Sequence, residues 1–76
     1  MKANNGEQVR KVFASNVQQE MEERDWIADD LAEATGLAIS TVERVLDGEY
    51  FTSGIVEKIC SAFNLDYWVL LVKVVE

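Results

Sequence analysis

The side chains of this sequence that could carry out chemistry are fourteen acidic residues and one cysteine, Cys60. Histidine is absent, so a serine or cysteine nucleophile has no imidazole base to activate it. The carboxylates show neither the pairing of a general acid with a general base nor the spacing and central glycine of a calcium loop. A lone cysteine cannot build a zinc site, and Cys60, next to Ile59, fits a small buried hydrophobe. We therefore expect no enzyme activity, no metal site and no cofactor.

The elements that must position the polar residues begin with a helix over residues 7–24. Its apolar side chains recur every three or four residues, which is typical of a helix with one buried stripe: Val9, Val12, Phe13, Val17 and Met21. Asp25 is expected to cap a second helix over 28–35, which Gly36 ends in a left-handed turn.

Ser40 and Glu43 form an S-x-x-E capping box, which predicts a third helix from residue 39 or 40 to Asp47. Val42 and Val45 are expected to hold that helix in the core, and Gly48 ends it. A fourth helix over 55–63 follows, with Thr52 or Ser53 as its cap.

The last segment, residues 67–76, is almost wholly apolar and contains Lys73 as its basic residue. As a fifth helix it suits a small bundle, whereas its β-branched content equally favours a dimerisation strand. Both alternatives stay open, and both make the segment the natural seam of a homodimer. The expected seam residues are Trp68, Leu70, Val72 and Val74. The expected fold is a compact all-α bundle of four or five helices.

Length and charge limit the function further. Seventy-six residues, 49% of them apolar, fit one domain over 1–76 with a flexible start at 1–6. The polar opening lacks the apolar region of a secretory signal, and no apolar run reaches the ~20 residues of a membrane span, so we expect a cytoplasmic protein. The net charge is −7, and between residues 20 and 33 seven acidic side chains accompany one basic one. Such a surface is either simply solvated or a docking face for a basic partner.

The two short helices joined through Gly36 have the arrangement of a helix-turn-helix at residues 28–47. Five short motifs accompany these helices: a Leu-Ala pair at 31–32, a Thr-Gly turn at 35–36, a Ser-Thr-Val run before Arg44, a Leu-x-Gly end at 46–48 and Ala-Phe-Asn-Leu-Asp at 62–66. With these features the stretch 31–66 resembles the Cro and phage-repressor type of helix-turn-helix domain, also called the xenobiotic-response-element type. Residues 40–48 are also similar to the headpiece of lactose-repressor-like regulators, but the closing helix favours the first family.

The resemblance implies a small transcriptional regulator of repressor, Cro or antitoxin type, from phage or prophage, that binds a palindromic DNA operator as a homodimer. The third helix would enter the major groove, and the amino end of the second would lie near a phosphate. The base-reading positions that it implies are Ala38, Ile39, Ser40, Glu43 and Asp47. The candidates that it implies for contacts with the DNA backbone are Thr41, Arg44 and Tyr50.

The charges depart from the family's pattern. The family usually has glutamine where Ala28 stands, and polar or basic side chains at Ile39 and Asp47. Affinity for DNA rests largely on cations that neutralise phosphates, and Arg44, the one basic residue of the third helix, has an ion pair with Asp47 or Asp30 as an alternative role. A second hypothesis therefore keeps the fold but replaces DNA by a basic protein partner, as in an anti-repressor, a phage inhibitor or a DNA mimic. The residues of that acidic face are Asp29, Asp30, Glu33, Glu43 and Asp47.

Overall fold

The structure is a computed structural model of the chain and describes residues 5–66 and 69–72. Within these residues it contains no strand, and its helices are α1 (Asn5–Arg24), α2 (Ala28–Thr35), α3 (Ile39–Leu46), α4 (Ser53–Ala62) and α5 (Val69–Val72). The radius of gyration of 11.6 Å is close to the value of about 11 Å expected for a compact chain of this length. The expected all-α bundle with a helix-turn-helix is confirmed.

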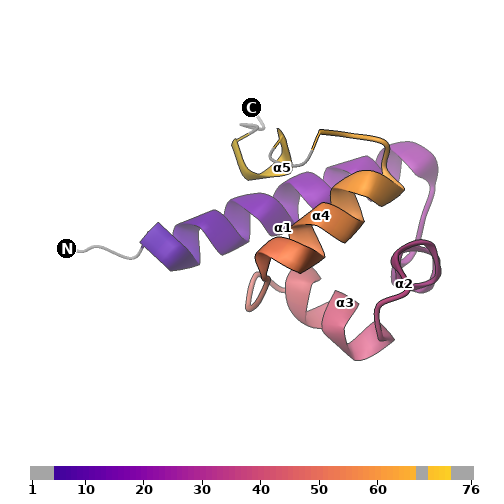
Figure 1. The fold of residues 1–76 in the computed structure, drawn as a ribbon, viewed down its shortest axis with the longest axis horizontal. Helices are drawn as coiled ribbons and strands as arrows, with labels where there is room; N and C mark the ends of the chain where they lie inside the picture. Colours follow the sequence, from indigo (N-terminus) through magenta and orange to yellow (C-terminus); the bar gives the residue numbers. More distant parts are fainter. Residues whose placement is uncertain (1–4, 67–68, 73–76) are drawn as a thin grey trace.

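The long helix α1 supplies the surface on which the others pack. Both α3 and α5 contact α1, and Figure 1 shows them on opposite sides of it. Phe13, Val17 and Met21 of α1 are buried, as the apolar period predicts. Val9, expected in the same stripe, is 37% exposed because the first turns of α1 extend beyond the other helices (Figure 1). The core is completed by buried residues of the other helices and of the segment after α4: Leu31, Val42, Val45, Ile55, Val56, Ile59, Cys60, Phe63 and Leu70.

The start of α1 and the cap of α2 differ from the sequence prediction, whereas α2 itself begins at Ala28 as expected. Residues 5 and 6, expected to be flexible, belong to α1. Asp25 has a φ of 61°, and the Trp26 amide donates to the Met21 carbonyl at 2.8 Å, which is a Schellman ending of α1. The expected Asp25 cap on α2 is therefore wrong. Asp30 takes that role instead, because its carboxylate accepts a hydrogen bond of 2.9 Å from the Ile27 amide.

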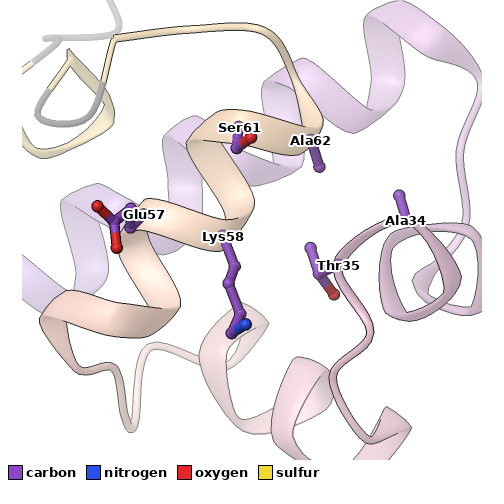
Figure 2. A pocket seen from close by; sticks show the side chains of 6 residues that line it. All are labelled: Ala34, Thr35, Glu57, Lys58, Ser61 and Ala62. Carbon is purple, nitrogen blue, oxygen red and sulfur yellow. The ribbon is translucent and has the colours of Figure 1, made fainter.

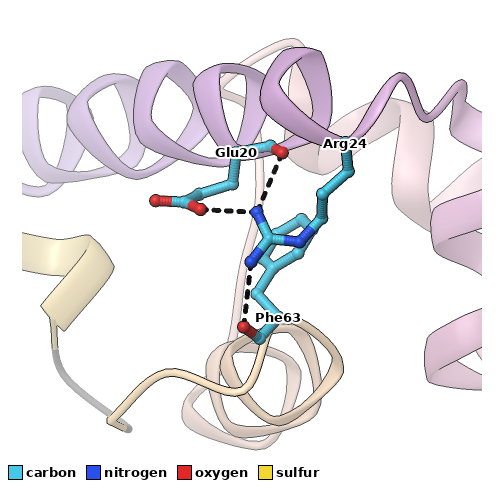
Figure 3. A network of polar contacts seen from close by, with 3 residues as sticks. All are labelled: Glu20, Arg24 and Phe63. Carbon is cyan, nitrogen blue, oxygen red and sulfur yellow. Dashed lines mark hydrogen bonds and ion pairs between the residues drawn. The ribbon is translucent and has the colours of Figure 1, made fainter.

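Arg24 joins the end of α1 to the end of α4 (Figure 3). One guanidinium nitrogen donates to the carboxylate and carbonyl of Glu20 at 2.6 and 3.0 Å, and the other donates to the Phe63 carbonyl at 3.1 Å. The guanidinium also lies 4.7 Å from the centre of the Phe63 ring. Glu20 is only 6% exposed, so its carboxylate is largely removed from water and gains from a charged partner, whereas Arg24 stays partly exposed.

The C-terminal segment is helical where it is described, so a strand over Val69–Val72 is wrong. Leu70 is fully buried in the core of its own chain, and its carbonyl accepts a hydrogen bond of 2.8 Å from Asn16 Nδ2. This burial removes Leu70 from the expected dimer seam. Of the other seam residues, Val72 belongs to α5, while Trp68 and Val74 lie outside the described residues. None of the helices described has the length and apolar character needed to cross a bilayer.

Candidate nucleic-acid interface

The turn between α2 and α3 is built by a glycine and a threonine. Gly36 has a φ of 78°, and its amide donates to the Ala32 carbonyl at 2.8 Å. The Thr35 hydroxyl donates to the Leu31 carbonyl at 2.7 Å and accepts from the Leu37 amide at 3.2 Å. These bonds satisfy the last carbonyls of α2 and fix the direction in which the chain enters α3. The left-handed turn that the sequence predicts at Gly36 is confirmed.

Helix α3 has one buried and one exposed face. Val42 and Val45, the predicted core residues, are 0% and 1% exposed. Ile39 is 40% exposed, Thr41 is half-buried and Ala38, just before the helix, is exposed. The other predicted base-reading residues, Ser40, Glu43 and Asp47, are exposed, and so is Arg44, a candidate for contact with the DNA backbone. The fold thus brings the predicted base-reading positions together on the outside of one helix.

The predicted capping box of α3 is not formed. Its N-cap is Ala38, in an extended conformation, and no side chain caps the first amides. Ser40 is therefore the second helical residue, too late to cap the helix. Within the part of the chain that the structure describes, the side chains of Ser40 and Glu43 form no hydrogen bond or ion pair, so both are available for an outside ligand.

Two side chains of α1 hold the end of α3. Gln18 Nε2 donates to the Leu46 carbonyl at 2.7 Å, and Arg10 Nε donates to the Gly48 carbonyl at 3.3 Å. Leu46 is the last residue of α3 and Gly48 lies just beyond it, so no helical amide reaches either carbonyl. Neither Gln18 nor Arg10 was among the residues predicted for the site. A four-residue spacing through the buried Ala14 places them on one side of α1, but spacing alone does not show what they contact.

Arg44 lies against an aromatic ring and forms no ion pair. Its guanidinium carbon is 4.6 Å from the centre of the Tyr50 ring, and Tyr50 itself is half-buried. The ion pair that the sequence suggested with Asp47 or Asp30 is not formed, since no ion pair in the described part of the chain includes Arg44. The Arg44 charge therefore stays exposed beside the outer face of α3.

Helix α2 carries two acidic side chains in its first turn and a third one turn later. Asp29 and Glu33 are exposed, whereas Asp30 is half-buried and engaged with the Ile27 amide. With Glu43 and Asp47, all five residues predicted for the acidic docking face belong to the helix-turn-helix. Within residues 5–66 and 69–72, no group of three His, Cys, Asp or Glu side chains is placed to hold a metal ion.

An open cavity of about 360 Å³ lies between α2 and α4 (Figure 2). Lys58 and Glu57 give it one charge of each sign, and the Thr35 hydroxyl on its wall already bonds to the Leu31 carbonyl. The complete lining is Ala34, Thr35, Glu57, Lys58, Ser61 and Ala62. None of the predicted reading residues lines it, so the cavity is separate from the outer face of α3.

Comparison with known proteins points to one family. Residues 16–67, more than half of the chain, match the family model of the Cro/C1-type HTH DNA-binding domain. The chain is also similar to the crystal structure of the hypothetical transcription factor NHTF from Neisseria, with a TM-score of 0.81 over 95% of this chain and 84% of that chain. Their sequences are 22% identical, so the likeness shows the fold. The comparison with curated proteins finds no match.

Proposed function

Because this chain belongs to the Cro/C1-type helix-turn-helix DNA-binding family, we propose that it is a transcriptional repressor of Cro or antitoxin type that binds operator DNA as a homodimer. In this proposal α3 of each protomer enters the major groove. Ser40 and Glu43 contact base edges, and Arg44 contacts a phosphate. In proteins with this motif, the N-terminal residues of the second helix of the motif, here α3, lie against the bases.

The observation that carries the proposal is the division of α3 into two faces. Val42 and Val45 are buried, which fixes the helix on the bundle, while Ser40, Glu43 and Arg44 point away from it into solvent. Ser40 can donate to or accept from any base, and Glu43 can accept from the amino group of cytosine. The methyl groups of the exposed Ile39 can contact thymine. A helix so held supports direct readout.

A homodimer supplies two such helices. Half-sites one turn of DNA apart are separated by about 34 Å, and the protomer measures 38 × 25 × 18 Å, so two adjacent copies have dimensions that suit this spacing. We place the seam at the apolar C-terminal residues other than Leu70. Trp68, Val72 and Val74 remain its candidates.

Selection from a pool of random duplexes tests the proposal. The wild type should enrich an inverted repeat whose half-sites lie about 10 base pairs apart. Glu43→Ala should relax the preference at one position of each half-site, by about 1–3 kcal/mol. Glu57→Ala is the matched control, because it removes the same charge from α4 and should leave the enriched sequence unchanged. A pool that stays random after selection would contradict operator binding.

The charges favour a second candidate, a basic protein partner. The helix-turn-helix exposes four carboxylates but only one arginine on α3, and the carboxylate of Asp30 already occupies the amino end of α2. A phosphate is repelled by such a surface, whereas a lysine- or arginine-rich protein is attracted. The exposed carboxylates are Asp29, Glu33, Glu43 and Asp47.

Charge reversal separates this candidate from DNA binding. The double variant Asp29→Lys, Glu33→Lys leaves the Asp30 cap of α2 intact. If cross-linking captures a basic partner on the wild type, the double variant should no longer capture it. The affinity of the variant for duplex DNA should instead increase. Retention of the same partner by the variant would contradict the acidic docking face.

A further inference from the structure

The stacking of Arg44 on Tyr50 depends on the turn that follows α3. Gly48 has a φ of 76°, and the Glu49 amide donates to the Arg44 carbonyl at 3.0 Å. This Schellman ending reverses the chain after α3. It returns Tyr50 to the last helical turn, where its ring lies 4.6 Å from the guanidinium carbon of Arg44.

The Tyr50 ring is a fixed platform. It is half-buried and packs against the hydrophobic core. The next residue, Phe51, meets the fully buried Phe13 edge to face, with ring centres 5.2 Å apart. Such aromatic pairs stabilise beyond their buried area, so the backbone at residues 50 and 51 is held on α1.

The stack also decides which groups of Arg44 stay available. A guanidinium can stack on an aromatic ring through its flat face, and in that arrangement its in-plane N–H donors stay free for a ligand. An ion pair would instead occupy those donors, and Glu43 and Asp47 are near in sequence to compete for them. In the structure neither carboxylate pairs with Arg44.

We propose that Tyr50 is a positioning residue that holds the Arg44 guanidinium, with its N–H donors open, against one phosphate of the DNA backbone. The inference rests on the proposed DNA-binding function. Arg44 lies in the last turn of α3, and base edges are contacted by the first turns of such a helix, which favours a phosphate as its ligand. The planar guanidinium can donate to two phosphate oxygens at once. Because the ring already fixes its orientation, the side chain loses little conformational freedom on binding, which raises the affinity.

The test measures binding of a mixed-sequence DNA duplex across a range of salt concentrations. Arg44→Ala should weaken binding and lower the slope of log affinity against log salt by about one per protomer. Tyr50→Phe keeps the ring and should bind like the wild type. Tyr50→Leu keeps apolar packing without a ring and should bind about two- to fivefold more weakly. In an Arg44→Ala background, Tyr50→Leu should have no further effect.

Two further measurements separate positioning from a loss of folding. The Arg44 Cδ protons should show an upfield ring-current shift in the NMR spectrum of the free wild type and of Tyr50→Phe, but not of Tyr50→Leu. Arg44→Lys keeps the charge without the planar group, so its binding should respond less to Tyr50→Leu than the binding of the wild type does. A Tyr50→Leu loss that persists in the Arg44→Ala background would overturn the inference.

The outcomes also distinguish this inference from the function on which it rests. If Arg44→Ala weakens binding and Tyr50→Leu does not, the positioning role is wrong while DNA binding stands. If the wild type binds no duplex even at ~50 mM salt, both are overturned.

Discussion

Two glycines flank α3 in nearly the same backbone conformation, yet only one of them is tightly packed. Gly36 and Gly48 have φ values of 78° and 76°, so alanine at either position adopts an unfavourable left-handed conformation. A Cβ atom at Gly36 meets nothing within 4 Å. At Gly48 it would lie 3.3 Å from Lys11 Cγ and 3.6 Å from Lys11 Cα. The pair therefore separates the backbone cost of alanine from its packing cost.

The expected destabilisation follows from these contacts. The left-handed conformation costs an alanine about 1–2 kcal/mol, partly offset by about 0.4–1 kcal/mol from the smaller conformational freedom of the unfolded chain. Gly36→Ala should thus lower the free energy of unfolding by roughly 1 kcal/mol. Gly48→Ala carries the same backbone cost, and crowding at a buried site adds about 1 kcal/mol or more. The crowding comes from Lys11 Cγ at 3.3 Å, which lies close to the backbone of α1 and has to shift by a few tenths of an ångström, whereas Lys11 Cα at 3.6 Å is in ordinary van der Waals contact.

Urea and thermal unfolding followed by circular dichroism measure the difference. For a domain of this size, 1 kcal/mol corresponds to about 4–8 °C in Tm, so Gly48→Ala should melt at least that much below Gly36→Ala. Equal melting temperatures for the two variants would refute the close packing of Gly48 on α1. A Gly36→Ala variant less stable than Gly48→Ala would refute the turn geometry as well.

Three other predictions, two of them substitutions and one a labelling experiment, test the packing of the fold. Asp30→Ala should cost about 0.3–1.5 kcal/mol of unfolding free energy through loss of the α2 cap, whereas the control Asp29→Ala should change it by less than about 0.5 kcal/mol in urea unfolding. Asn16→Ala leaves the Leu70 carbonyl without its donor and should cost about 1–3 kcal/mol, with faster amide exchange in α5; unchanged exchange would contradict the assigned contact. Burial raises the pKa of the Cys60 thiol above its usual 9.0, so the stability that its neutral form contributes is complete below that pH and declines above it. A thiol reagent at pH 8 should therefore label Cys60 no faster than the chain unfolds, and rapid labelling of the native protein would contradict its burial.

The sequence predicted the helices that have a clear apolar period or a special backbone conformation at their ends. The bounds of α2, the left-handed turn at Gly36 and the end of α3 before Gly48 agree with the structure, as does Thr52, one of the two residues expected to cap α4. Each of these features depends on residues within a few positions of one another. They can therefore be predicted from local chemistry alone, without knowledge of how the helices pack.

The errors arose where two local solutions were equally good. Aspartate suits both a helix cap and a left-handed turn, and Asp25 adopts the turn while Asp30 caps α2. The S-x-x-E pattern at residues 40–43 fits a helix start, but the turn after Gly36 starts α3 at Ile39. Only the packing of the whole bundle selects between such alternatives.

The remaining differences involve contacts between residues that are distant in sequence. Leu70 fits a dimer seam as well as a core, and its burial depends on Asn16 of α1. The family resemblance supplied the site residues. Ile39, Ser40, Glu43 and Arg44 are exposed on α3, whereas Thr41 and Tyr50 are half-buried. Their partners, such as the ring beside Arg44, depend on how the chain turns back after α3.

The most direct test of DNA binding is the affinity of the purified protein for a mixed-sequence duplex at ~50 mM and ~200 mM salt, with its mass in solution measured alongside. We predict a dimer whose affinity falls with salt, with a log–log slope of at least about two in magnitude, because each protomer contributes the Arg44 charge to one phosphate. A protein that binds no duplex at the lower salt would contradict this account and favour a basic protein partner.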